Sequence, residues 1–278
     1  MCSAIAVNAP VGVMDSGVGG LTVLKHLTRQ LAHEHFIYYA DSAYAPYGNQ
    51  SAIKIQQRCF AIADLLIEQG AKALVVACNT ATAAAISPLR DHYALPIIGM
   101  EPAVKPAAAA SKTGIIGVLA TTGTLQSAQF AALLEHYGHG VQVVTQACVG
   151  LVECIEQGQL DHAHTLSLLK TYCQPLIDAG ADTIVLGCTH YPFVRAHIQH
   201  IVGPQVTLID TGAAVAKRLQ QILAEKNLLN PASDQVSNQA GYLSTADAQH
   251  ASTSVKPLFL TSGSQQTQRV MQQLWQIL

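Results

Sequence analysis

The strongest constraint on the fold is an internal repeat that places a cysteine at the same point in two parts of the chain. Ile67–Thr80 reads IEQGAKALVVACNT, and Ile177–His190 reads IDAGADTIVLGCTH. Both segments have a leading Ile, an acidic residue, a Gly suited to end a helix, an apolar run and then Cys78 or Cys188. Two related halves are the economical explanation of this repeat.

Short runs rich in Val and Ile alternate with amphipathic stretches along the chain. The predicted strands are Val11–Met14, Phe36–Tyr39, Ala73–Val76, Ile97–Ile98, Ile115–Leu119, Val141–Val144, Ile184–Leu186 and Val206–Ile209. The predicted helices include Leu21–Leu31, Ser51–Gln69, Thr124–Tyr137, Thr165–Ala179 and Ala213–Lys226. Uninterrupted apolar strands between helices are typical of parallel sheets covered on both faces. The pattern therefore predicts an α/β fold with two pseudo-symmetric parallel-sheet domains and an active site in the cleft between them.

The pattern changes near Met100–Ala110 and again near Asp210–Gly212, which suggests that the chain crosses between the halves twice. We therefore expect a first domain from residues 1–103 and 212–278 and a second domain from residues 104–211. The C-terminal tail is then expected to pack on the first domain.

Composition narrows the class of protein. The chain is 50% hydrophobic and 12% charged, with a mean hydropathy of +0.26, so it can bury a substantial core. The net charge is −2 and no basic stripe is visible, which argues against a nucleic-acid partner. Apolar runs are short and the first ten residues carry no basic residue, so we expect neither a membrane span nor a secretory signal.

Seven cysteines, an odd number with no CxxC pair, argue against a disulfide framework and a structural zinc site. A cytoplasmic location is the expectation. The polar segment Asn230–Thr253 is expected to form a surface loop.

Polar or reactive residues follow four of the predicted strands. They are Asp15-Ser16-Gly17, Cys78-Asn79-Thr80, Thr121-Thr122-Gly123 and Cys188-Thr189-His190. Ligands of open α/β sheets bind at the carboxyl ends of the strands. If the two halves face each other, the two cysteines therefore meet across one cleft.

Two opposed thiols suit the inversion of an amino-acid α-carbon. Inversion needs a base on one face of that carbon and an acid on the other. A free thiol has a pKa of about 8.5. Cys78 and Cys188 are each expected at the point where a strand ends and a helix begins, and a helix N-terminus lowers the pKa of a thiol, so a thiol and a thiolate can coexist near neutral pH. The competing interpretation is that Cys78 and Cys188 are small core residues; their matched positions in the repeat favour a functional role.

The neighbouring residues fit the same chemistry. Asp15 can assist Cys78 or hold the substrate ammonium, although it can equally be a helix N-cap. His190 can relay a proton for Cys188 or merely brace a turn. Carboxylate binding is assigned to hydroxyl, amide and backbone groups of Ser16, Asn79, Thr80, Thr121 and Thr189.

A Gly-rich stretch, DSGVGGLT, raises the possibility of a nucleotide site. It lacks the GK[ST] of a P-loop and the third Gly of GxGxxG, so this signal is weak. The glycines are better explained by a tight strand-to-helix turn and close approach of a substrate.

Four segments together resemble the glutamate racemases of the aspartate/glutamate racemase superfamily. They are DSGVGGLTV (Asp15–Val23), DSAYAPYGNQS (Asp41–Ser51), ACNTATA (Ala77–Ala83) and GCTHYP (Gly187–Pro192). The resemblance implies interconversion of L- and D-glutamate by Cys78 and Cys188, with no PLP, metal or nucleotide cofactor. It also implies a bacterial homodimer that supplies D-glutamate for peptidoglycan and hence for the cell wall and cell shape.

The resemblance also implies a set of substrate contacts. They are Asp15, Ser16, Tyr47, Gly48, Asn79, Thr80, Thr189 and His190. Tyr47 and Gly48 enter the set through the resemblance alone. Family members often carry a catalytic-site Glu after a cysteine-containing strand, which here is Glu153 or Glu156. Glu156 is preferred, as a partner of His190.

Two alternatives stay open at this point. The same chemistry can act on aspartate or another small acidic amino acid, since pocket size is not visible in a sequence. A protein of another class, a non-catalytic two-lobed binder of a small ligand, has the same outline.

Overall fold

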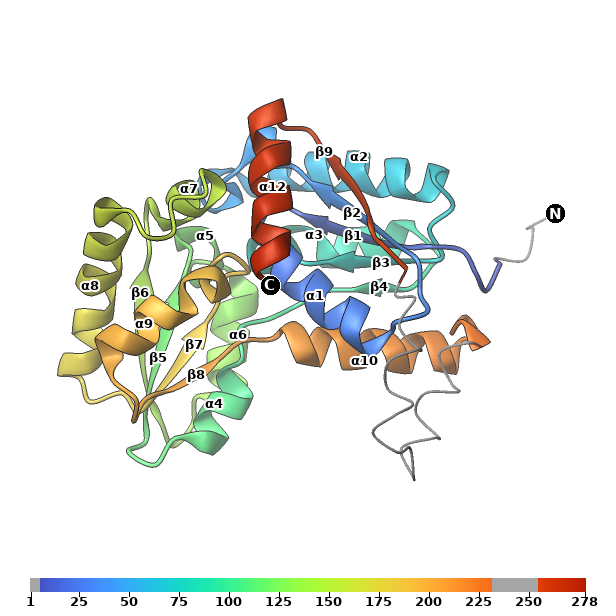
Figure 1. Cartoon of the computed structure of the whole chain (residues 1–278). Helices are drawn as coiled ribbons and strands as arrows, with labels where there is room; N and C mark the ends of the chain where they lie inside the picture. The colour runs from blue at the N-terminus through green and yellow to red at the C-terminus, as the bar shows by residue number, and fades with distance from the viewer. Residues whose placement is uncertain (1–5, 232–254) are drawn as a thin grey trace, which may run out of the picture.

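Two parallel sheets form the framework of the computed structural model, which describes residues 6–231 and 255–278. The first contains β1 (Val11–Asp15), β2 (Phe36–Ala40), β3 (Ala73–Val76), β4 (Ile97–Ile98) and β9 (Leu258–Thr261), in the order β4-β3-β1-β2-β9. The second contains β5 (Ile115–Ala120), β6 (Gln142–Ala147), β7 (Thr183–Leu186) and β8 (Thr207–Ile209), in the order β6-β5-β7-β8. The predicted α/β class with two parallel sheets is confirmed (Figure 1).

The two sheets repeat the same topology. Read from its other edge, the second sheet has the order β8-β7-β5-β6, which matches β4-β3-β1-β2 strand for strand. The strands before Cys78 and Cys188, β3 and β7, therefore hold equivalent places, each beside the first strand of its half. The repeat seen in the sequence is a repeat of position in the fold.

Helices surround both sheets. The first sheet is accompanied by α1 (Leu21–Gln30), α2 (Ala52–Glu68), α3 (Asn79–His92), α10 (Gly212–Glu225) and α12 (Gln265–Ile277). The second half contains α4 (Val104–Ala110), α5 (Thr122–Leu125), α6 (Ala128–Tyr137), α7 (Leu151–Glu156), α8 (Ala163–Asp178) and α9 (Arg195–Val202).

One predicted helix, Thr124–Tyr137, is divided into α5 and α6. Ser127 starts the second piece as its N-cap, because its Oγ accepts a hydrogen bond of 3.1 Å from the backbone amide of Phe130. The boundaries of β6 also lie later than the predicted Val141–Val144. The segment predicted as a polar surface loop, Asn230–Thr253, lies outside the described residues from position 232 onward.

The C-terminal tail returns to the first sheet. β9 pairs in parallel with β2, from Ile37 opposite Leu258 to Ala40 opposite Thr261. α10 and α12 both pack against α1. The amino- and carboxyl-terminal parts of the chain therefore share one core.

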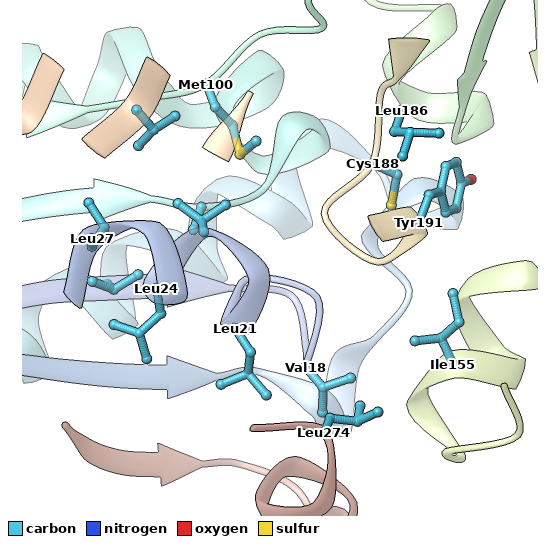
Figure 2. Close-up of a cluster of buried hydrophobic side chains, with 14 of the residues drawn as sticks. Val18, Leu21, Leu24, Leu27, Met100, Ile155, Leu186, Cys188, Tyr191 and Leu274 are labelled. Atoms are coloured by element: carbon cyan, nitrogen blue, oxygen red, sulfur yellow. The ribbon is translucent and has the colours of Figure 1, made fainter. Parts of the chain in front are cut away.

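One apolar cluster runs from the first half into the second. Val18 and Leu21 of the first half, Ile155 and Tyr191 of the second, and Leu274 of α12 all belong to it (Figure 2). Because burial of apolar surface is non-directional and roughly proportional to area, this cluster holds the two sheets together beside the loop that follows β1.

In the parts of the chain that the structure describes, no helix combines the length and the apolar character needed to cross a bilayer.

The burial of α12 generates a stability prediction. Leu274 is 3% exposed within the shared cluster, so Leu274→Ala is expected to lower the free energy of unfolding by about 2 to 5 kcal/mol. Gln272→Ala, an exposed position on the same helix, is the control and is expected to change it by about 0.5 kcal/mol or less. Urea unfolding followed by circular dichroism measures both. Equal effects would mean that α12 is not part of the core.

Candidate active site

A narrow cavity with a volume of about 10 Å³ lies where the carboxyl ends of both sheets meet. Its lining consists of Ser16, Pro46, Tyr47, Gly48, Cys78, Asn79, Thr80, Thr121, Val152, Gly187, Cys188, Thr189 and His190. Both thiols of the repeat therefore face one space. Of the substrate contacts expected from the sequence, all except Asp15 are in this lining.

Cys78 is the N-cap residue of α3. Its Sγ accepts a hydrogen bond of 3.4 Å from the amide of Ala81 and lies 3.7 Å from Ser16 Oγ. Burial raises the pKa of this thiol well above its ordinary value, and the charge of Asp15 raises it further, against the opposing Ala81 amide and Ser16 hydroxyl. The expectation that the helix N-terminus lowers this pKa is therefore wrong in its net direction, because desolvation outweighs the helix.

Cys188 follows β7, and its Sγ lies 3.7 Å from His190 Nδ1. The chain after it forms a 3-10 turn, Tyr191–Val194, and α9 begins only at Arg195. The helix predicted to begin at this cysteine therefore begins several residues later in the chain. An imidazole, rather than a helix N-terminus, is the polar neighbour of this sulfur (Figure 2 shows the cysteine beside Tyr191).

His190 is buried between a thiol and a carboxylate. Its Nε2 lies 2.6 Å from Glu156 Oε1. Burial alone would lower the pKa of the imidazole, but the hydrogen bonds with Cys188 and Glu156 outweigh it and raise this pKa well above its ordinary value. The protonated ring is thus favoured, with one N–H directed at Glu156 and the other at the sulfur of Cys188.

Glu156 connects three segments that are distant in the sequence. In addition to its contact with His190, its Oε1 accepts from the amide of Val18 at 2.7 Å and its Oε2 from Ser42 Oγ at 2.9 Å. Glu153 instead lines a neighbouring groove that also contains Cys148. Of the two carboxylates left open by the sequence, Glu156 is the one that contacts the histidine.

The glycines after β1 are required for close approach between the halves. A Cβ at Gly17 would overlap the carboxylate of Glu156, and one at Gly19 would overlap His190 and Thr189. Neither residue is among those with positive φ. The expected close approach is thus made by protein side chains of the second half, and a left-handed turn is not the reason for these glycines.

Asp15 lies behind the cavity, 2% exposed. Its Oδ2 accepts from the amides of Gly17 and Gly20, both at 3.0 Å, and Thr189 Oγ1 donates to its Oδ1 at 3.3 Å. Because Gly20 is the N-cap residue of α1, Asp15 holds the beginning of this helix. Burial raises its pKa from 3.8 to about 6, against the charge of His190 and the two glycine amides.

Asn79 is the least satisfied polar residue of the cavity lining. Neither its Oδ1 nor its Nδ2 has a hydrogen-bond partner within residues 6–231 and 255–278, although both atoms are buried. A buried polar group without a partner costs about 1 to 3 kcal/mol, so a ligand that supplies both a donor and an acceptor would recover this cost. Asn79 is therefore well placed to recognise a polar ligand.

A trio of hydroxyls joins the two halves beside the cavity. Thr80 Oγ1 lies 2.9 Å from Thr121 Oγ1 and 3.1 Å from Thr124 Oγ1, and Thr121 donates to Thr124 at 3.0 Å. Thr80 belongs to α3 and the other two follow β5, so these bonds close the cleft. Thr124 was not predicted from the sequence.

Further residues around the cavity were also missed. Asp41 and Ser42 follow β2, as other polar residues follow the strands, so the same strand-end rule could have found them. Val152 belongs to α7 and enters the lining only through the fold.

Comparison with known proteins is decisive for the family. A family model described as Asp/Glu/Hydantoin racemase matches residues 11–219. The glutamate racemase of Ectopseudomonas mendocina is 54% identical over 258 residues, which cover 92% of this chain and 97% of that protein.

The chain belongs to the Asp/Glu/Hydantoin racemase family.

Solved structures agree with this assignment of the racemase. A glutamate racemase isoform of Bacillus anthracis has a TM-score of 0.78 at 33% identity, with 95% of this chain and 93% of that one covered. The glutamate racemase of Francisella tularensis in complex with D-glutamate has a TM-score of 0.77 at 30% identity, with 97% and 94% covered. The resemblance to glutamate racemases is confirmed, and the protein is an enzyme, an isomerase.

The burial of Asp15 predicts how stability depends on pH. Its pKa of about 6 means that the folded racemase retains a proton that the unfolded chain has already lost above pH 4. Relative to Asp15→Asn, the free energy of unfolding is expected to fall by about 2 kcal/mol as the pH rises from 4 to 7.

Urea unfolding at several pH values measures this difference. Asp182→Asn is the control. Burial is the largest single effect on the pKa of Asp182 and raises it, but four hydrogen bonds together outweigh burial and hold this pKa at about 2, so the carboxylate stays ionised throughout this range. A pH profile of the Asp15→Asn protein parallel to that of the native racemase would contradict the prediction.

Proposed function

We propose that this racemase interconverts L-glutamate and D-glutamate without a cofactor, by a two-base reaction of Cys78 and Cys188. The observation that carries the proposal is that both thiols line one cavity between equivalent strands of two related sheets. Similar proteins from Ectopseudomonas mendocina, Stutzerimonas stutzeri and Pseudomonas putida are each named glutamate racemase, which supports glutamate as the substrate.

The reaction balances with two thiols and no other reagent. One cysteine, as thiolate, removes the α-proton of the bound amino acid, while the opposite cysteine donates its thiol proton to the other face of the same carbon. The C–H bond that breaks and the one that forms lie on opposite faces, so configuration inverts and the two thiols exchange protonation states. By the assignment implied by the family, Cys78 deprotonates D-glutamate and Cys188 deprotonates L-glutamate.

The neighbours of each sulfur are suited to exchange protons with it or to change its pKa. His190, held protonated by Glu156, faces Cys188 and is suited to relay a proton to and from it. Asp15 acts on Cys78 through its charge, and its pKa of about 6 lets it exchange a proton near neutral pH. The two cysteines thus have different partners, an imidazole beside Cys188 and a carboxyl group acting on Cys78.

Substrate carboxylates are bound by neutral groups in this proposal. No Lys or Arg is present among the described residues that line the cavity. Hydroxyl and amide groups remain, and the proposed contacts are Ser16, Gly48, Asn79, Thr80, Thr121 and Thr189, with the ring of Tyr47 as a wall.

The expectations about the wider role stay predictions. They are supply of D-glutamate to peptidoglycan, a cytoplasmic location and a homodimer. We also propose that the cleft separates a domain of residues 1–103 and 212–278 from one of residues 104–211, which is compatible with the membership of the two sheets.

The mechanism predicts the effect of removing either thiol. Cys78→Ala and Cys188→Ala are each expected to lower kcat by about 10² to 10⁴, because each loses one positioned acid or base. Circular dichroism of D-glutamate, and incorporation of deuterium at the α-carbon from deuterium oxide, measure the reaction.

Cys59→Ala and Cys173→Ala are the matched controls, since both are buried cysteines outside the cavity lining, one in each half. They are expected to retain the native kcat. A Cys78→Ala protein with the native rate would end the two-base mechanism. Turnover of aspartate in preference to glutamate, in a screen of both enantiomers, would change the substrate but not the chemistry.

The contact between Glu156 and His190 predicts a second effect. Glu156→Gln removes the charge that favours the protonated imidazole, so kcat/KM is expected to fall on the order of tenfold to a hundredfold, with a shifted pH profile. Glu153→Gln, which removes the same charge beside the neighbouring groove, is expected to retain activity within about twofold. A larger loss of kcat/KM in Glu153→Gln than in Glu156→Gln would mean that Glu153 is the partner of His190.

A further inference from the structure

A buried carboxylate outside the cavity carries four hydrogen bonds. Asp41 follows β2 and is 0% exposed. Its Oδ2 accepts from Tyr47 Oη at 2.6 Å and from Arg58 Nε at 2.9 Å. Its Oδ1 accepts from Arg58 Nη2 and from Ser262 Oγ, both at 2.8 Å. Such a fully bonded buried group defines the relative positions of everything that it binds.

One of these partners belongs to the cavity. Tyr47 and Gly48 form a 3-10 turn, Tyr47–Asn49, and both line the cavity. The Tyr47 hydroxyl donates its hydrogen bond to Asp41 and is therefore not a free donor for a ligand. Tyr47 can contact a ligand only through its ring and through the backbone of the turn. A Cβ at Gly48 would lie 2.8 Å from Thr121 Cβ, so the turn already touches the second half. A small shift of the turn therefore changes the shape of the cavity.

The other partners anchor Asp41 to two separate elements. Arg58 belongs to α2, binds the carboxylate with two donors and has its guanidinium 3.9 Å from the ring centre of Tyr44. Ser262 follows β9, and its Oγ also accepts from the amide of Ala43 at 3.2 Å. The C-terminal segment, residues 255–278 as the structure describes it, thus reaches the loop that carries the turn, although none of these residues lines the cavity.

We propose that Asp41 is a positioning residue for the racemase, with Ser262 of the C-terminal segment as its support. Through the Tyr47 hydroxyl, Asp41 holds the Tyr47–Asn49 turn in the place that the substrate requires. This inference rests on the proposed function, because it names the substrate-facing turn of that same cavity. A turn held in advance saves the cost of ordering it when the substrate binds.

The test compares Ser262→Ala, Tyr47→Phe and their double variant with Tyr93→Phe. The control loses a tyrosine–carboxylate bond of the same length at an exposed place, since Tyr93 Oη donates to Asp64 Oδ1 at 2.6 Å outside the cavity lining. Tyr47→Phe is expected to raise KM about tenfold with a smaller change in kcat, and Ser262→Ala to raise it severalfold. The double variant is expected to fall short of the product of the two effects, because both act through Asp41. Ser262→Thr, which keeps the hydroxyl, is expected to restore KM.

Several results would overturn the inference. They are a native KM in both single variants, strictly multiplicative effects, or a loss confined to Tm and equal to that of Tyr93→Phe. The affinity for D-glutamate, measured by calorimetry on the same proteins, separates the inference from the proposed function. A native protein that binds D-glutamate but does not racemise it contradicts the proposed function. A native affinity in Tyr47→Phe and Ser262→Ala contradicts the role of Asp41 whether or not the protein turns over.

Discussion

The carboxylate of Glu156 is the contact on which the arrangement of the site depends. It binds the imidazole of His190 within its own half, and the Val18 amide and Ser42 hydroxyl of the other. These three donors come from segments that follow β7, β1 and β2. Because ionised acceptors form the stronger class of hydrogen bond, one side chain sets both the ring that faces Cys188 and the loop that faces Cys78. The glycines after β1 make room for it, since a side chain at Gly17 would occupy the same space.

Burial dominates the electrostatics around Cys78, whereas hydrogen bonds dominate beside Cys188. The pKa of the Cys78 thiol is raised by desolvation and by Asp15, whereas Cys188 lies beside an imidazole whose pKa is raised by its hydrogen bonds. Cys78 and Cys188 hold equivalent positions in the two halves, but their neighbours differ: Asp15 acts on Cys78 and His190 lies beside Cys188. In the two-base reaction that we propose, each sulfur takes the acid role in one direction and the base role in the other, and its own neighbours serve both roles. Low dielectric strengthens each of these interactions and makes it costly to bury the Asn79 side chain, which has no hydrogen-bond partner among the residues that the structure describes.

Much of the fold follows from local patterns. The Val- and Ile-rich strands and the repeat around Cys78 and Cys188 identify two parallel sheets, because apolar periodicity and glycine caps act over a few residues. The same rule, that ligands bind at the carboxyl ends of strands, places Ser16, Asn79 and Thr121 in the site. Boundaries were less accurate: the break between α5 and α6 depends on whether Ser127 caps a helix, which competes with simple continuation of the periodicity.

The sequence by itself determined the fold class, the equivalent positions of Cys78 and Cys188 in the two halves, and the resemblance to the family. Repeats, strand ends and motifs are local patterns, so they can be recognised from the order of the residues alone. Only the tertiary structure decided that Glu156 rather than Glu153 meets His190, that Asp15 lies behind the cavity, and that burial outweighs the helix N-terminus at Cys78. It also brought Ser262 to Asp41. Such contacts join residues far apart in the chain, and desolvation depends on everything that surrounds a group, so neither is encoded in any local stretch of sequence.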